Sequence, residues 1–208
     1  MSKGIVLIGG GGHCKSVLDI ILNNKDYDRI VITDYDLPKD TEVMGVKVVG
    51  NDDLLPDLIK SGYEYAFITV GSIKSTLLRR KLYNTALEIG YRIPIIVDSS
   101  AVISSFASVQ QGAFIGKNAV VNSEANIGDC AIINSGAIVE HECSVGNFSH
   151  VSVGAKLCGN VSIGNDTFIG AGTTIIQGIS VGDGTIIGAG SVVLSNVENN
   201  LIKYGIVK

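Results

Sequence analysis

The sequence contains no tryptophan, only 3 prolines and 2 methionines, and aromatic residues amount to 6% of its 208 positions. It also lacks a basic cluster, because its 16 lysines and arginines are scattered along the chain and are outnumbered by 20 acidic residues. Proteins that follow a nucleic-acid backbone concentrate positive charge, so nucleic acid is not an expected partner. Only 3 histidines are present, which leaves few side chains that exchange a proton near neutral pH.

Long hydrophobic runs are missing too, since none approaches the roughly 18 residues that a membrane-spanning helix requires. The apolar run at 5–8 is too short for the hydrophobic region of a signal peptide, and it leads directly into glycines. CxxC spacing is absent, because the cysteines stand at positions 14, 130, 143 and 158. We therefore expect a cytoplasmic protein without a membrane span or a metal site, in which the cysteines are small buried residues rather than disulfides.

What the second half does contain is a repeat of six residues. Aliphatic side chains occupy sixteen consecutive repeat positions: Ile103, Val109, Ile115, Val121, Ile127, Ile133, Val139, Val145, Val151, Leu157, Ile163, Ile169, Ile175, Val181, Ile187 and Val193. Two positions before most of them stands a small residue, and glycine often follows. A period of six fits neither an amphipathic helix nor a simple alternating strand. It predicts short strands joined by tight corners and stacked so that the aliphatic column is buried.

The first half has a different pattern, in which apolar runs typical of buried strands alternate with helical spacing. Strands are predicted at 4–8, 29–33 and 66–70, and helices at 14–22 and 76–88. The first strand leads into Gly9–Gly12, and the second ends in Asp34. This is the arrangement of a Rossmann-like βαβ unit, in which a ligand lies beyond the carboxyl ends of the strands.

The two halves together resemble a known bacterial family. The glycine loop with His13 behind it, the aspartate after the second strand, and hexads after a short α/β domain are similar to the sialic acid O-acetyltransferases and the nucleotide-sugar 4-amino N-acetyltransferases. The resemblance implies an α/β plus all-β fold. A small Rossmann-like βαβ domain would occupy residues 1–98, and a left-handed parallel β-helix of hexapeptide repeats with a short C-terminal tail would occupy 99–208.

Acetyl transfer from a thioester requires a base for the attacking group and a donor for the developing oxyanion. His141 and His150 both stand outside the inward aliphatic column, so both can face outward from the coils. Residues 18 apart stack on neighbouring coils about 4.8 Å away. This spacing places Gly159 beside His141, where a residue without a side chain leaves space for a substrate.

The stretch 138–155 matches the motif of the family. By that match His141 is the general base, Glu142 orients its ring and raises its basicity, and His150 helps to hold the acyl donor. Because neighbours in an extended strand point to opposite faces, a contact between Glu142 and His141 requires a corner conformation or an adjacent subunit. Asn134, one coil before Ser152, is a further candidate for orienting the acceptor.

The resemblance also implies ligands and an assembly. Acetyl-CoA would be the co-substrate, held in the groove between the coils of a homotrimer, and no metal is implied. The groove residues would be His150, Gly159, Gly170, Ala171, Gly188 and Ala189. The residues that contact a nucleotide-linked sugar would be Gly11, Gly12, His13, Asp34 and Gly71. The terminal Gly-x-Pro-Ala-Lys segment of the family is represented here only by Tyr204–Lys208.

The expected function is acetyl-CoA-dependent N-acetylation of the 4-amino group of a nucleotide-linked amino-deoxy sugar in bacterial glycan biosynthesis. One alternative is O-acetylation of sialic acid or another polysaccharide sugar, which differs only in acceptor contacts that the sequence does not reveal. Another is a non-catalytic module that binds sugar nucleotides, in which the histidines would be incidental, because a β-helix by itself does not imply an enzyme.

Overall fold

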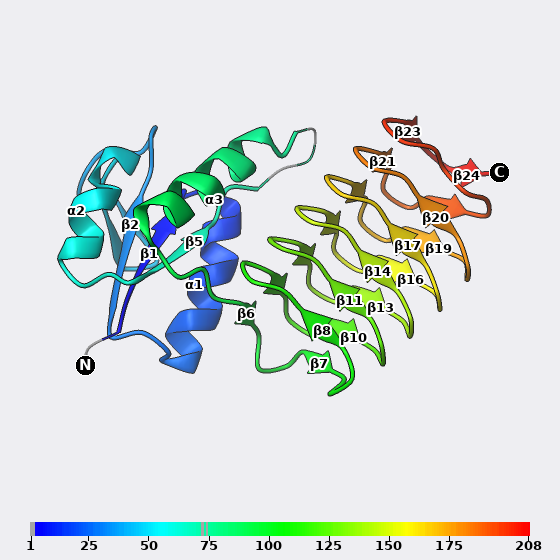
Figure 1. Cartoon of the computed structure of the whole chain (residues 1–208), viewed down its shortest axis with the longest axis horizontal. Coiled ribbons are helices and arrows are strands. Elements are labelled where there is room, and N and C mark those ends of the chain that lie inside the picture. Colours follow the sequence, from blue (N-terminus) through cyan, green and yellow to red (C-terminus); the bar gives the residue numbers. More distant parts are fainter. Residues whose placement is uncertain (1–2, 72, 74) are drawn as a thin grey trace. The chain divides into compact units, whose positions relative to one another are not determined.

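The computed structural model describes residues 3–71, 73 and 75–208, and these fall into two compact units. The first unit holds the described residues up to 71 together with Leu77–Ile96, and the second holds Val97–Lys208 with residues 73, 75 and 76. The first is an α/β unit and the second is a β-helix (Figure 1). Both halves of the predicted α/β plus all-β fold are therefore confirmed.

A mostly parallel sheet forms the centre of the first unit, with the strand order β3-β4-β2-β1-β5. Its strands are β1 (Gly4–Ile8), β2 (Arg29–Thr33), β3 (Glu42–Val43), β4 (Val46–Gly50) and β5 (Tyr65–Ile68). The helices are α1 (Gly12–Asn24), the 3-10 helix η1 (Asp52–Leu54), α2 (Leu55–Lys60) and α3 (Leu77–Ile89). All of β1 is buried, as expected for an apolar parallel strand inside a sheet.

The predicted strands at 4–8 and 29–33 form at those residues, and the third, predicted at 66–70, forms at Tyr65–Ile68. It ends at the buried Thr69, whose hydroxyl donates to the carbonyls of Ile8 and Gly9 and ties the strand end to the glycine loop. Residues 34–64, for which the sequence pattern predicted no helix or strand, add β3, β4, η1 and α2.

The glycine loop follows β1, the strand at which the connections of the sheet change from one side of β1 to the other. β1 pairs with β2 on one edge and with β5 on the other, so the helices that follow β1 and β5 start at the same end of the sheet. Parallel sheets open a crevice at such a point. Gly9 has φ +106, in the left-handed region that glycine tolerates, and a Cβ there would collide with Val70.

In the described part of the second unit, two-residue strands form three parallel walls of a left-handed β-helix (Figure 1). The first wall contains β6 (Ile96–Val97), β9 (Phe114–Ile115), β12 (Ile132–Ile133), β15 (His150–Val151), β18 (Phe168–Ile169), β21 (Ile186–Ile187) and β23 (Ile202–Lys203). The second contains β7 (Val102–Ile103), β10 (Val120–Val121), β13 (Ile138–Val139), β16 (Lys156–Leu157), β19 (Thr174–Ile175), β22 (Val192–Val193) and β24 (Ile206–Val207). The third contains β8 (Ser108–Val109), β11 (Asn126–Ile127), β14 (Ser144–Val145), β17 (Ser162–Ile163) and β20 (Ser180–Val181).

The hexad period sets the pairing between coils. Val121 pairs with Val139, which is 18 residues later, and the same interval separates stacked residues on all three walls. The aliphatic column from Ile115 to Val193 is at most 3% exposed, so it forms the core. Beyond Val193 the period is lost, and Ile206 pairs with Val192 after a shorter interval.

Candidate active site

His141 and Glu142 meet at a corner that follows β13. Glu142 has φ 59, so the backbone turns and its side chain lies on the same side as its neighbour. Nδ1 of His141 is 3.1 Å from Oε2 of Glu142. The contact is made within one chain, because the corner removes the alternation of side chains that an extended strand imposes.

This contact orients the imidazole rather than stabilising the fold. The two side chains are 60% and 58% exposed, and ion pairs at such positions contribute only about 0–1 kcal/mol. When Nδ1 of a neutral imidazole donates its proton to a carboxylate, the lone pair stands on Nε2. The Nε2 atom of His141 is therefore the one that can accept a proton.

Gly159 lies directly against that ring. The corners of the two coils are joined by a hydrogen bond in which the N–H of Asn160 donates to the carbonyl of His141 at 2.9 Å. A Cβ added to Gly159 would lie 2.5 Å from both Cε1 and Nε2 of His141. Only glycine at position 159 leaves the imidazole in this place.

Asn134 and His150 form a second pair, on the wall that contains β12 and β15. Nδ2 of Asn134 is 3.1 Å from Nε2 of His150, while Oδ1 of Asn134 accepts the N–H of Ser135 at 2.8 Å. The His150 ring is half-buried and stands edge-on to Phe168, with 5.2 Å between the ring centroids. Two residues that the sequence treated separately are thus joined by one hydrogen bond.

The four predicted groove positions nearer the C-terminus lie on one wall, directly after β18 and β21. Gly170 and Gly188 are buried, while Ala171 and Ala189 are exposed. A Cβ on Gly170 would collide with the backbone of Gly188 and Ala189 one coil later, so close stacking of coils explains this glycine. Gly188 is covered in the same way by the ring of Tyr204, which is 71% exposed.

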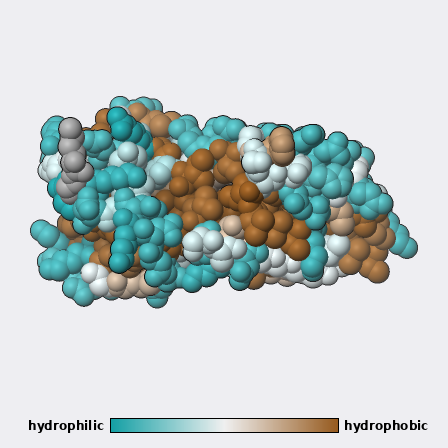
Figure 2. Space-filling model, turned by 90° about the horizontal axis from the view of Figure 1, so that it is seen from below, coloured by the Kyte–Doolittle hydropathy of each residue, from teal (hydrophilic) through white to brown (hydrophobic). Residues whose placement is uncertain are grey.

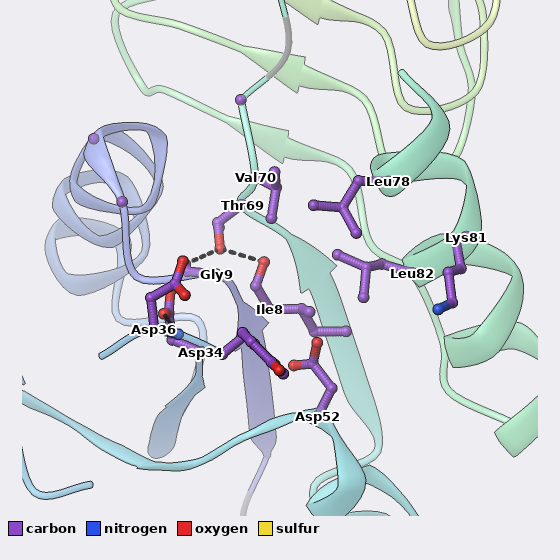
Figure 3. Close-up of a pocket in the computed structure, with 14 residues that line it drawn as sticks. Ile8, Gly9, Asp34, Asp36, Asp52, Thr69, Val70, Leu78, Lys81 and Leu82 are labelled. Atoms are coloured by element: carbon purple, nitrogen blue, oxygen red, sulfur yellow. Dashed lines mark hydrogen bonds between the residues drawn. The ribbon is translucent and has the colours of Figure 1, made fainter. Parts of the chain in front are cut away.

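The first unit contains a cavity of about 500 Å³ at the carboxyl ends of its strands (Figure 3). Gly11, Gly12, Asp34 and Gly71, all predicted from the sequence, are among the residues that line it. A Cβ on any of the three glycines would find no atom within 4 Å, so the space beside their backbones is open. Gly11 is the N-cap of α1, whose positive end favours an anion.

His13, the fifth predicted substrate residue, is not among the described residues that line this cavity. It stands in the first turn of α1 and is half-buried. A helix turns by about 100° per residue, so the side chain at position 13 points in a different direction from the cavity that Gly11 and Gly12 face.

Asp34 holds the glycine loop and its own loop together. Its carboxylate accepts the N–H groups of Gly10 at 2.6 Å, Asp36 at 2.8 Å and Leu37 at 2.9 Å. Burial acts to raise the pKa of this carboxyl, but the three backbone donors outweigh it, and the pKa lies below its usual value. Three of the acceptor positions of Asp34 are therefore already occupied by the protein.

The cavity has further lining residues that the sequence pattern did not single out: Tyr35, Asp36, Asp52, Thr69, Val70, Leu78, Lys81 and Leu82. Leu78, Lys81 and Leu82 come from α3, and the acidic side chains come from the segments after β2 and β4 (Figure 3). Assigning 46–50 as a strand would have drawn attention to Asp52, because side chains that follow parallel strands gather at one edge.

Asp52 is the carboxylate of this cavity whose environment disfavours its charge. Its Oδ1 accepts the hydroxyl of Thr33 at 2.7 Å. Burial raises the pKa of the Asp52 carboxyl above its usual value, against the lowering effect of that hydrogen bond, and the charges of Asp34 and Asp53 raise it further. Asp52 therefore accepts a proton or an N–H donor more readily than a carboxylate in water.

The described residues contain no cluster of three His, Cys, Asp or Glu side chains that could hold a metal ion. Within 3–71, 73 and 75–208, no helix has both the length and the apolar character needed to cross a bilayer. The cysteines are free thiols, of which Cys14, Cys130 and Cys143 are buried and Cys158 is half-buried. Burial raises the pKa of Cys14 to about 12, so this thiol is not a nucleophile at neutral pH.

Comparison with known proteins covers both units. The PglD N-terminal domain matches residues 4–86, and the bacterial transferase hexapeptide (six repeats) matches residues 160–195. A histidine-to-alanine variant of GDP-perosamine N-acetyltransferase from Caulobacter crescentus, solved in complex with CoA and GDP-perosamine, is 35% identical. That match covers 97% of this chain and 93% of the other, with a TM-score of 0.91.

The acetyltransferase domain of PglB from Neisseria gonorrhoeae, in complex with acetyl coenzyme A, is 30% identical, with coverage of 99% and 97% and a TM-score of 0.91. WeeI from Acinetobacter baumannii shares the fold at 17% identity, with coverage of 98% and 97% and a TM-score of 0.69. No curated protein sequence matches the chain.

The fold and the site define a hexapeptide-repeat acyltransferase that uses acetyl-CoA. The chain belongs to the acetyltransferase family that contains the Caulobacter crescentus and Neisseria gonorrhoeae enzymes. The resemblance to the nucleotide-sugar N-acetyltransferases inferred from the sequence is confirmed.

Proposed function

We propose that this enzyme transfers the acetyl group of acetyl-CoA to the 4-amino group of a nucleotide-linked amino-deoxy sugar in bacterial glycan biosynthesis. The observation that carries the proposal is the corner at which His141 donates to Glu142 and keeps Nε2 available beside Gly159. A relative that is 35% identical acts, by its description, on GDP-perosamine, and was studied with a histidine replaced.

In this mechanism His141 is the general base and Glu142 fixes its tautomer. The sugar amine attacks the thioester carbonyl, a C–N bond forms and the C–S bond breaks. Nε2 of His141 takes the proton that the amine loses and passes it to the departing thiolate of CoA, so that charge and atoms balance. Such proton transfer is worth about 10²–10⁴ in rate.

The cavity of the first unit has the chemistry to bind the nucleotide part of the acceptor. Its glycine side, where Gly11 and Gly12 face open space at the start of α1, suits the diphosphate. Its acidic side, with Asp36 and Asp52, repels phosphate but accepts the N–H groups of a base and the hydroxyls of a ribose. His13 and Asp34 support the loop around this ligand.

For the donor we propose a groove lined by His150, Gly159, Gly170, Ala171, Gly188 and Ala189. The exposed backbone at Ala171 and Ala189 can reach a ligand, whereas Gly170 and Gly188 permit the coils to stack.

We place the reaction in the cytoplasm, where acetyl-CoA is made. We assign acceptor binding to residues 1–98 and acyl transfer to residues 99–208.

We propose a homotrimer as the working assembly. Apolar side chains gather on the face shown in Figure 2, and the outer side of the second β-helix wall carries Val102, Val192 and Ile206, which are 63%, 38% and 69% exposed. Exposed apolar area of this kind is typical of a surface that another subunit covers. Sedimentation at increasing protein concentration tests the assembly, and a monomer at all concentrations contradicts it.

The function is tested with purified protein, acetyl-CoA and a panel of GDP-, UDP- and dTDP-linked 4-amino sugars, with free sialic acid alongside. Release of the CoA thiol together with an acetylated sugar nucleotide is the expected result. Acetylation of sialic acid alone would replace the N-acetyl assignment with O-acetylation. Tight binding of sugar nucleotides without any turnover would make the chain a binding module.

A further inference from the structure

The cavity of the first unit has an apolar side and an acidic side. Val70 follows β5 and Leu78 and Leu82 belong to α3, whereas the carboxylate of Asp52 enters from the segment after β4 (Figure 3). A nucleobase has the same two properties, because its ring faces are apolar and its edge carries hydrogen-bond donors and acceptors. Pockets of this kind take their specificity from a few polar groups that are held in place.

Asp52 is a polar side chain of the cavity that the fold holds in one position. Its backbone begins η1, and the hydroxyl of the buried Thr33 donates to its Oδ1 at 2.7 Å. Asp52 is half-buried. The side chains of Tyr35, Asp36 and Lys81 also line the cavity, but they are exposed and keep more rotamer freedom. Asp52 is therefore better suited than these three to distinguish one base from another.

The second oxygen of this carboxylate is available to a ligand. Whereas three backbone N–H groups occupy Asp34, no donor among the described residues reaches Oδ2 of Asp52. Burial raises the pKa of the Asp52 carboxyl, and the charges of Asp34 and Asp53 raise it further, so a donor that reaches Oδ2 stabilises a charge that the site disfavours. A carboxylate oxygen only accepts, so the ligand group facing Oδ2 must be an N–H or an O–H.

The common bases fall into two classes by the ring nitrogen of their pairing edge. Guanine, uracil and thymine carry an N–H there, next to a carbonyl oxygen. Cytosine and adenine carry a bare ring nitrogen, whose lone pair repels a carboxylate, and their amino group is displaced by one position along the edge. A site built to accept an N–H discriminates strongly against an analogue that lacks it, because the buried acceptor is then left unpaired.

We propose that Asp52 selects the base of the sugar nucleotide: its Oδ2 accepts the ring N–H of guanine, uracil or thymine, and bases without that N–H are excluded. Thr33 fixes the carboxylate for this contact. The proposal rests on the proposed function, because it places the nucleotide of the acceptor in this cavity. Base selection is nevertheless a property of the first unit that acetyl transfer itself does not require.

Calorimetry with nucleoside diphosphates tests the selection without any turnover. The probes are two pairs whose bases have equal ring size, UDP with CDP and GDP with ADP. In the pair that fits the cavity better, we expect the base with the ring N–H to bind about 10- to 100-fold more tightly, the range for a hydrogen bond to a charged group. Equal affinities within both pairs would overturn the proposal.

Asp52→Asn is expected to remove or reverse the preference. The hydroxyl of Thr33 donates to the side-chain oxygen, so the amide NH₂ group takes the place of Oδ2. This group donates to the bare ring nitrogen of cytosine or adenine and opposes a ring N–H, so the preference within the pair should fall at least about tenfold. The matched control is Asp53→Asn, which removes the same charge from an exposed neighbour outside the described lining of the cavity and should leave the preference unchanged.

The remaining outcomes separate base selection from the proposed function. An equal loss of affinity for all four nucleotides in Asp52→Asn would assign Asp52 to the ribose that they share, and would overturn base selection. A preference that survives Asp52→Asn unchanged would overturn it as well. In both cases acetylation of a nucleotide-linked sugar still stands. Absence of binding by all four nucleotides to the unmodified protein would contradict both proposals.

Discussion

The His141 ring and the backbone of Gly159 are in direct contact across neighbouring coils, with no room for even a methyl group between them. The two residues are distant in the sequence, but the hexad interval places them next to each other on neighbouring coils. A glycine on one coil creates the space in which His141 of the preceding coil stands. The imidazole is oriented by Glu142 from its own corner and by Gly159 from the adjacent one.

Gly159→Ala should lower activity without unfolding the protein. The new Cβ would lie 2.5 Å from Nε2 of His141 and must displace the ring, which is free to move because it is 60% exposed. We expect a fall in kcat of at least about tenfold, since catalytic groups tolerate little misplacement, with a thermal midpoint within a few degrees of the unmodified protein. In a His141→Ala background the substitution should have no further effect. A fully active Gly159→Ala variant would contradict this geometry.

His141→Ala should reduce turnover by about 10²–10⁴, the range that a general base contributes. Binding of the sugar nucleotide, measured by calorimetry, should be largely unchanged, because its cavity belongs to the first unit. The matched control is Asn126→Ala, an exposed position on another wall of the β-helix. An unchanged rate for His141→Ala would remove this residue from the mechanism.

Asp34→Ala should destabilise the protein at neutral pH. The substitution removes the acceptor of three backbone N–H groups, and hydrogen bonds to charged groups at a partly exposed site contribute roughly 1–3 kcal/mol. The folded-state pKa of Asp34 is lowered, so its contribution is complete above the unfolded pKa and is lost as pH falls through the folded one. Unfolding by denaturant at neutral and acid pH should show that the native protein and Asp34→Ala differ less in free energy of unfolding in acid. A difference that does not change with pH would show that the Asp34 charge is not its cause.

Asp52→Asn should have the opposite pH dependence. The folded-state pKa of Asp52 is raised, so the native protein loses stability as pH rises from the unfolded pKa through the folded one. The amide carries no charge and avoids this loss, so the variant should be more stable than the native protein at neutral pH and gain little in acid. The same variant should bind the sugar nucleotide more weakly. Thermal midpoints should be measured for both proteins from about pH 4 to 7. Equal midpoints of the variant and the native protein at every pH would show that burial does not raise the pKa of the Asp52 carboxylate.

The β-helix was predictable from the sequence because its stacking is local and periodic. Each aliphatic residue of the column repeats after six positions, and its partner on the next coil follows after 18, so the pairing of Val121 with Val139 follows from counting. The same count placed Gly159 beside His141. Prediction succeeds here because one interval determines every neighbour in a solenoid.

The pairing of Asn134 with His150 could not be obtained in this way. Counting by 18 stacks Asn134 on Ser152, but the side chain of Asn134 reaches His150, which is 16 positions away, because its amide is turned by the N–H of Ser135. The direction of a side chain depends on rotamer and on local donors, and neither is periodic. The contact between these two side chains is thus a product of the folded structure.

The cavity of the first unit shows the same limit. Gly11, Gly12 and Asp34 were identified because glycine loops and strand-end aspartates mark a known type of crevice. Asp52 was missed because the strand before it was not recognised. The α3 side chains were missed because tertiary packing decides which face of a helix points into a cavity. The sequence also could not show that the carboxylate of Asp34 accepts hydrogen bonds from backbone N–H groups of the surrounding loops.

By itself the sequence determined the two-part architecture, the family and the location of the corner that carries His141, since repeat period, glycine placement and histidine position are all properties of linear order. Only the tertiary structure decided which side chains face the ring nitrogens of His141 and His150 and which carboxylates line the cavity. Those properties depend on which donors and acceptors face one another, and only the folded backbone brings the facing groups together.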